Sequence, residues 1–198
     1  MSDAEPPAWP PSPLTWPAEP LSDGVVDLDR LTDDDVPRLV VGAGDSETAR
    51  WIPVPHPYTA RDAREFLALV EEAAQEGRML AFGLRRAGQA PLCGAVALHL
   101  EGRVGEAEIG FWVAPDARGE GLAPRGVRLV ARHAISALGC HRLELLTHPD
   151  NTASQRACER AGALREGVRR AGIARDDREP LDAVVYSLLP EDLAAARA

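Results

Sequence analysis

The stretch from residue 106 to residue 123 joins a strand-like run to a glycine-containing turn. A β-prone run ends at Pro115, and Arg118, Gly119 and Gly121 then lead into an amphipathic, helix-like pattern. The first N–H groups of a helix have no internal partner and lie at the positive end of the helix dipole, so they bind phosphate groups. Glycine lacks the Cβ atom that would keep a phosphate away from those N–H groups. We therefore interpret this turn as a pyrophosphate-binding loop.

Two common phosphate-binding motifs do not fit this loop. A Walker A loop needs a lysine after its glycines, and the chain contains no lysine. A Rossmann fingerprint needs a third glycine where Pro124 stands. The pattern that is present is Arg-x-x-Gly-x-Ala, at Arg118, Gly121 and Ala123.

A second motif follows after one helix-like and one strand-like segment. It has the pattern Asn-x-x-Ser-x-Arg-x-x-Glu-Arg-x-Gly, with its defined positions at Asn151, Ser154, Arg156, Glu159, Arg160 and Gly162. The two motifs, in this order and at this separation, resemble the GNAT N-acetyltransferase superfamily and its RimJ/RimL-like branch. The resemblance covers residues 23–190, which is nearly the whole chain.

The resemblance implies an α/β (α+β) GNAT fold. Its sheet is expected to be mixed, mostly antiparallel, with six to seven strands and helices on both faces. It also implies acetyl-CoA as the cosubstrate. The residues expected to hold the coenzyme are Trp112, Val113, Arg118, Gly119, Glu120, Gly121, Leu122, Ala123, Asn151 and Ser154.

Acetyl transfer to an amine needs a proton acceptor, because a primary amine with a pKa of ~10 is mostly protonated at neutral pH. Glu108 is the carboxylate best placed to act as the base, directly or through water. The alternative is that Glu108 only hydrogen-bonds neighbouring strands or loops. Glu106 and Glu144 are expected to face solvent. The backbone N–H of Val113 is the expected donor to the developing oxyanion.

The departing thiolate needs a proton, and two residues are candidates for supplying it. A tyrosine often stands in the superfamily where this chain has Cys158, which we expect to be a small core residue instead. Ser154 is favoured, because the resemblance places its hydroxyl near the coenzyme sulfur. Its alternative role is to satisfy a helix N-terminal amide. Asn151 likewise either binds the pantetheine arm or acts only as a helix N-cap.

The acceptor cleft of the resembling family lies under the helices of the N-terminal half. Aromatic and imidazole side chains of that region are candidates for lining it, namely Trp51, His56, Tyr58 and Phe66. The alternative for each is that it only packs the helices onto the sheet.

The predicted activity is transfer of an acetyl group to a primary amine by direct attack in a ternary complex. The amine belongs to a protein N-terminus or to a small molecule. The alternatives are a non-catalytic acyl-CoA-binding module and an acyltransferase that uses a longer acyl-CoA or an antibiotic amine. A homodimer is possible, because relatives commonly dimerise.

Composition bounds the class of protein. The chain has 198 residues, 45% of them hydrophobic and 27% charged, as in one soluble globular domain. Its net charge of −9 argues against non-specific nucleic-acid binding. The sequence has no apolar run of ~20 residues and no signal-peptide pattern, which predicts a cytoplasmic protein without membrane contact. Three dispersed cysteines and five histidines without ligand spacing predict reduced thiols and no metal.

The chain divides into a Pro-rich N-terminal arm at residues 1–22, the GNAT domain at 23–190 and a C-terminal tail at 191–198. The arm is expected to be mobile rather than docked through Trp9 and Trp16. Residues 42–57 are expected to form a loop, as are the charged residues 175–179. The expected strands cover residues 25–28, 79–85, 91–100, 107–113, 142–147, 163–168 and 181–188, and the expected helices begin near Thr32, Thr59, Leu122 and Asn151.

Overall fold

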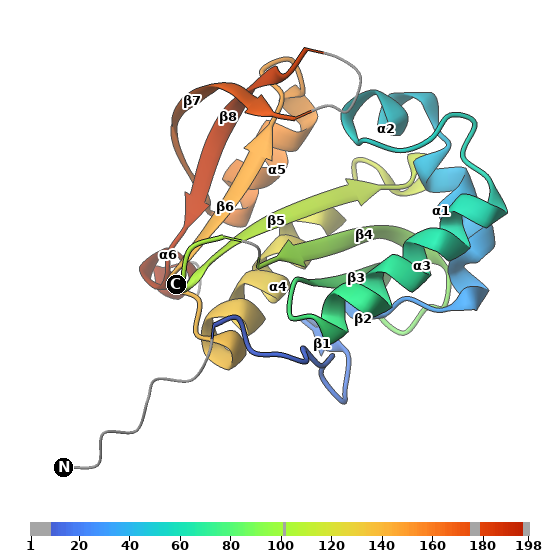
Figure 1. The fold of residues 1–198 in the computed structure, drawn as a ribbon, viewed down its shortest axis with the longest axis horizontal. Helices are drawn as coiled ribbons and strands as arrows, with labels where there is room; N and C mark the ends of the chain where they lie inside the picture. The colour runs from blue at the N-terminus through green and yellow to red at the C-terminus, as the bar shows by residue number, and fades with distance from the viewer. Residues whose placement is uncertain (1–8, 101, 175–178, 196–198) are drawn as a thin grey trace.

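An eight-stranded sheet forms the centre of the computed structural model, which describes residues 9–100, 102–174 and 179–195 (Figure 1). The strand order is β1-β2-β3-β4-β5-β6-β8-β7, and β5 and β6 are parallel while the other pairs are antiparallel. The strands are β1 (Leu21–Ser22), β2 (Val26–Arg30), β3 (Met79–Arg86), β4 (Leu92–His99), β5 (Glu106–Val113), β6 (Arg142–Thr147), β7 (Leu164–Ile173) and β8 (Leu181–Leu188). This confirms the expected fold class, with β1 as an edge strand beyond the expected count.

Helices cover both faces of the sheet, as expected (Figure 1). Helices α1 and α3 pack on one face, and α4 and α5 pack on the other. No helix among the described residues is long and apolar enough to cross a membrane. The helices are η1 (Asp33–Asp35), α1 (Val36–Ala43), α2 (Ser46–Trp51), α3 (Ala60–Gln75), η2 (Pro115–Ala117), α4 (Leu122–Leu138), α5 (Thr152–Ala161) and α6 (Pro190–Ala195).

Local signals in the sequence set the ends of the longer helices. Thr59 and Asp62 form a capping box at the start of α3, in which each side chain binds the other residue's backbone N–H. Helix α4 ends at Gly139, whose φ of 74° suits a residue without a Cβ atom. Asn151 caps α5 through its side-chain oxygen, which accepts from the Ser154 N–H at 3.0 Å. The starts expected near Thr59 and Asn151 are thus confirmed by their side-chain caps, while α4 begins at Leu122 as expected but without such a cap.

The expectation of a loop at residues 42–57 is wrong, because this segment contains α2. The Asp45 side chain accepts a hydrogen bond from the Thr48 N–H at 3.0 Å and so caps this short helix. A helix of six residues is unstable alone, so contacts with the rest of the domain must hold it in place.

The expectation of a mobile arm is wrong for its described part, residues 9–22. Leu14 is 2% exposed, and its N–H donates to the Ala74 carbonyl at 2.8 Å. The Trp16 indole N–H donates to the Ala81 carbonyl at 3.0 Å, and Trp9 packs against the core. The arm is therefore docked through its tryptophans. Its residues 1–8, residues 175–178 of the charged loop and residues 196–198 of the tail lie outside the described residues.

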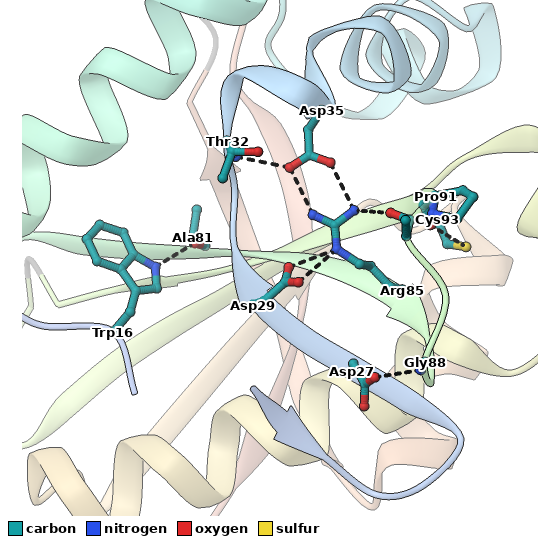
Figure 2. A network of polar contacts seen from close by, with 11 residues as sticks. Trp16, Asp27, Asp29, Thr32, Asp35, Ala81, Arg85, Gly88, Pro91 and Cys93 are labelled. Carbon is teal, nitrogen blue, oxygen red and sulfur yellow. Dashed lines mark hydrogen bonds and ion pairs between the residues drawn. The ribbon is translucent and has the colours of Figure 1, made fainter. Parts of the chain in front are cut away.

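A buried arginine joins the start of α1 to the sheet (Figure 2). The Arg85 guanidinium donates to both oxygens of Asp35 at 2.9 Å, to Asp29 at 2.9 Å and to the Ala90 carbonyl. The side chains of Arg85 and Asp35 are 11% and 5% exposed. Because Asp35 is almost fully removed from water, loss of the Arg85 cation would leave its carboxylate buried and unpaired.

We expect Arg85→Met to lower the free energy of unfolding by about 3 kcal/mol, because it leaves Asp35 buried without its counter-ion. Urea denaturation of the purified chain measures this change. Arg61→Met is the matched control, since Arg61 forms an ion pair with Glu65 on the exposed surface of α3 and the change should cost less than ~0.5 kcal/mol. An equal decrease in the free energy of unfolding of the two variants would show that the buried network stabilises the fold no more than a surface ion pair does.

Candidate active site

Strands β5 and β6 pair over only part of their length. Their register runs from Glu106 opposite Arg142 to Glu108 opposite Glu144, and no pairing follows within these described strands. Beyond this point β5 continues along β4 to Val113, while β6 continues along β8 to Thr147. Figure 1 shows the two strands diverging toward their carboxyl ends. The sheet therefore opens into a gap between residues 109–113 and residues 145–147.

Backbone donors of β5 point into this gap. The Ala114 N–H donates to the carbonyl of Cys93 in β4 at 2.8 Å. Because successive backbone groups of an antiparallel strand face alternate neighbours, the N–H groups of Phe111 and Val113 face away from β4. These N–H groups therefore point into the gap, because the pairing between β5 and β6 has already ended at Glu108. The Val113 N–H, expected as the oxyanion donor, is thus accessible to a ligand.

The glycine-containing loop after β5 leads directly into α4. Gly119 and Gly121 have φ angles of 82° and 75°, and Gly121 is the residue before the helix, with no side-chain cap. Among the described residues, the N–H groups of Gly119, Glu120 and Gly121 have no protein acceptor. A Cβ atom at either glycine would meet open space. Free N–H groups at the positive end of a 17-residue helix therefore border open space, as an anion site requires.

A cavity of about 450 Å³ connects this loop with the gap. One side is formed by α2, the opposite side by α5, and the floor by the last residues of β5. The lining residues are Glu47, Thr48, Trp51, Ile52, Phe111, Trp112, Val113, Ala117, Arg118, Gly119, Gly121, Leu122, Ala123, Pro124, Asn151, Ala153, Ser154, Arg156, Ala157 and Arg160. Nine of the ten residues expected to hold the coenzyme are in this set, and the two sequence motifs meet across the cavity.

Glu120 is the expected coenzyme residue outside that lining. Its carboxylate accepts from Arg86 of β3 at 2.9 and 2.6 Å, and this hydrogen bonding lowers the pKa of Glu120. The Glu120 side chain therefore fixes the loop to the sheet, which leaves its backbone N–H as the group able to bind an anion.

The side chains at the start of α5 differ in access. Both Ser154 and Asn151 line the cavity, and the side-chain oxygen of Asn151 also serves as the helix cap. Capping leaves the amide nitrogen of Asn151 for a ligand, so both roles expected for this residue are compatible. Cys158 is fully buried, and burial raises the pKa of its thiol to about 12. Cys158 is thus the small core residue that the sequence indicated.

Glu108 does not line this cavity, which is called the coenzyme cavity below because nine of the residues expected to hold the coenzyme line it. It borders a neighbouring cavity of about 330 Å³ together with His99, Glu106 and Glu144. Its side chain reaches solvent, yet the surrounding cleft removes part of its hydration and raises its pKa; Glu144 adds to this rise and Arg169 opposes it. On the same face of β5, Gly110 leaves open space between Glu108 and Trp112, because the nearest atom to its missing Cβ lies 4.0 Å away.

Glu144 is held by ion pairs and is only partly exposed, so the expectation that it simply faces solvent is wrong. Its oxygens lie 2.8 Å from Arg142 and 3.6 Å from Arg169, and its side chain is 27% exposed. Two carboxylates in register, Glu108 and Glu144, therefore share one cleft with the Arg169 side chain. The described residues include no group of three His, Cys, Asp or Glu side chains arranged to hold a metal.

The four acceptor candidates lie in different environments. Trp51 lines the coenzyme cavity. Tyr58 and Phe66 pack in the core between α1, α3 and the sheet, and burial raises the pKa of Tyr58. His56 is exposed in the segment between α2 and α3. The structure thus brings one of the four to the cavity, and a substrate role for the others stays a prediction.

Sequence reasoning missed α2 as a wall of the cavity. Thr48 and Glu47 line it, and the Trp51 ring lies 5.3 Å from the ring of His148, which follows β6. The available signal was the run Asp45-Ser-Glu-Thr, a typical N-cap followed by acidic residues.

Comparisons with known proteins agree with this geometry. The family model described as "Acetyltransferase (GNAT) domain" matches residues 26–164. The uncharacterized N-acetyltransferase YoaA of Bacillus subtilis (strain 168) is 27% identical over 163 residues, which cover 82% of this chain and 92% of that protein.

Solved structures share the fold. Mycobacterium smegmatis RimJ in complex with CoA-disulfide superposes with a TM-score of 0.74 and 24% identity, covering 96% of both chains. The ribosomal-protein-S5-alanine acetyltransferase from Vibrio fischeri superposes with a TM-score of 0.71 and 16% identity, covering 88% of this chain and 98% of that one.

The raised pKa of Glu108 predicts a cost in stability that depends on pH. The folded state binds this proton more tightly than the unfolded state, so stability falls as pH rises from the ordinary value of 4.5 through the folded pKa. Glu108→Gln should therefore be more stable than the wild type near pH ~7 and no more stable near pH ~4. Urea denaturation at both values tests this, with Glu72→Gln on the exposed face of α3 as the control. A gain that is independent of pH would contradict the prediction.

Proposed function

The chain belongs to the acetyltransferase (GNAT) family, and from this premise we propose that it transfers an acetyl group from acetyl-CoA to a primary amine. The observation that carries the proposal is the junction of the open β5–β6 gap with the free N–H groups at the start of α4. In this proposal the thioester lies in the gap between β5 and β6, and the linked phosphates lie at the N–H groups before α4. The coenzyme supplies the activated acetyl group, and the residues of the chain bind it, orient it and move protons.

The N–H groups of residues 119–123 are proposed to bind the pyrophosphate. Orphan helix N-terminal amides and the helix dipole both favour an anion there, and Pro124 leaves no further N–H in the first turn. Arg118 and Glu120 act through the loop's shape, since their side chains have protein partners. The Phe111 and Val113 N–H groups then face the extended part of the coenzyme and its carbonyl oxygen.

Three groups are proposed to perform the chemistry. The Val113 N–H donates to the thioester oxygen as negative charge develops on it. Glu108 accepts the proton of the attacking amine, and the Ser154 hydroxyl passes a proton to the departing sulfur and takes one back from water. Glu108 and Val113 are five residues apart, about 17 Å at ~3.4 Å per residue, so a chain of several water molecules over Gly110 is the proposed link from the amine to Glu108.

A protein N-terminal amine is the proposed acceptor. The support is the motif around Asn151 and Ser154, which resembles the RimJ/RimL-like branch, together with the fold shared with a ribosomal-protein acetyltransferase. The carboxylates of Glu108 and Glu144 beside the gap also suit a cationic amine before it loses its proton. Direct attack in a ternary complex fits because the buried Cys158 cannot serve as an acyl carrier. A homodimer stays a prediction.

The test measures thiol release with acetyl-CoA and a panel of short peptides bearing free N-terminal Ser, Ala, Met or Gly, with small amines alongside. We expect turnover with at least one acceptor. Glu108→Gln and Ser154→Ala should each lower kcat by about 100-fold and leave the coenzyme A Kd from calorimetry within about twofold. These outcomes follow because both residues act on protons rather than on the phosphates.

Glu106→Gln is the matched control for Glu108→Gln, since Glu106 borders the same cavity but lies farther from the gap on β5. It should retain wild-type kcat. Coenzyme binding without turnover on any acceptor would favour a non-catalytic acyl-CoA-binding module, and a lack of coenzyme binding by the folded chain would refute the proposal as a whole.

A further inference from the structure

Helix α2 spans the mouth of the gap and touches both of its sides. At its N-terminal end it meets the loop after β5 through Arg118, and at its C-terminal end Trp51 meets His148 after β6. Figure 1 shows α2 beyond the carboxyl ends of these two strands, next to α1. Helix α2 therefore forms one wall of the cavity that leads to the gap, with Glu47, Thr48 and Trp51 among its lining residues. Because an amine that enters this cavity passes α2, we call this helix the acceptor wall.

Arg118 points out of the loop rather than into the place of an anion. Its guanidinium donates to the Asp45 carboxylate, to the Thr48 hydroxyl at 2.8 Å and to the Val113 carbonyl at 3.4 Å. These partners come from the cap of α2, its first turn and the end of β5. One side chain thus ties α2 to the strand and the loop that border the gap.

Asp45 has two roles at this contact. It accepts the Thr48 N–H as the cap of α2, and it accepts Arg118 as an ion-pair partner. The Arg118 hydrogen bond, followed by the Thr48 N–H, holds the pKa of Asp45 below its usual value. Because the carboxylate is already paired with Arg118, that cation is not free to neutralise a phosphate. A helix of six residues is too short to be stable alone, so its position depends on contacts such as this pairing.

We propose that Arg118 is a positioning residue that clamps α2 to the coenzyme loop, so that the acceptor wall is held in place by the same loop that binds the phosphates. This rests on the proposed acetyl transfer at the gap. In this proposal the Arg118 side chain does not bind a phosphate. The phosphates bind the N–H groups of the loop, and the Arg118 guanidinium holds α2 in place.

Two variants separate the clamp from the helix cap. Arg118→Met removes the cation, and Asp45→Asn removes the charge while keeping a good N-cap residue. Arg61→Met, on the exposed surface of α3, is the control for the arginine change. The probes are coenzyme A in calorimetry, acetyl-CoA with the best peptide acceptor in steady-state kinetics, and hydrogen exchange of residues 46–52 with and without coenzyme A.

We expect both variants to raise the acceptor KM by about tenfold, as for loss of a charge-assisted hydrogen bond, and to speed hydrogen exchange in α2. The coenzyme A Kd should stay within about threefold of the wild-type value. Arg61→Met should change none of these. If Arg118 only stabilised the fold, its loss would lower the free energy of unfolding, and the acceptor KM and the coenzyme A Kd would change together.

Three results would overturn the clamp: an unchanged acceptor KM, unchanged exchange in α2, or a coenzyme A Kd raised about tenfold or more in Arg118→Met. The last would mean that the guanidinium neutralises a phosphate. If the wild type binds coenzyme A but acetylates no acceptor, the proposed function fails by itself. Hydrogen exchange in α2 then still decides whether the clamp exists.

Discussion

The early end of the parallel ladder between β5 and β6 is the constraint on which the site depends. Backbone N–H groups inside a sheet normally donate to carbonyl groups of the neighbouring strand. After Glu108 and Glu144 the hydrogen bonding between β5 and β6 stops. Strand β5 stays paired with β4 on its other side, and β6 stays paired with β8. The result is a pair of N–H groups, from Phe111 and Val113, that are held rigidly but left without a strand partner. A gap of this kind binds a chain-like ligand through backbone groups.

The loop that follows extends the same principle to the phosphates. The chain is acidic overall, with a net charge of −9, and two of its cations near the loop are already paired: Arg118 with Asp45 and Arg86 with Glu120. Binding of an anion therefore depends on oriented backbone dipoles at the start of α4, where free N–H groups require no counter-ion. The two arginines are thus paired within the protein, which leaves the backbone amides as the groups proposed to bind the anion.

Carboxylates border the gap on the side where the acceptor is proposed to bind. Glu108 and Glu144 lie in register on neighbouring strands, and ion pairs with Arg142 and Arg169 hold Glu144. Burial and the second carboxylate raise the pKa of Glu108, which makes it a better proton acceptor at a cost in stability. In the same way, α2 is a weak helix that is positioned by its contacts rather than by its own sequence. The partly desolvated Glu108 lowers stability, the short helix α2 is unstable alone, and both lie where the chemistry is expected.

The sequence by itself determined the fold class, the order of the main strands and helices, and the two motifs that line one cavity. These depend on local properties: alternation along β5, the apolar stripe of α4 and the caps at Thr59, Asn151 and Gly139. Tertiary structure alone decided the rest. It placed Glu108 in a cavity next to the coenzyme cavity, buried Tyr58, docked the tryptophans of the arm and set α2 against the loop after β5. It also turned Arg118 toward Asp45, because that contact joins residues 73 positions apart and no local pattern encodes such a pairing.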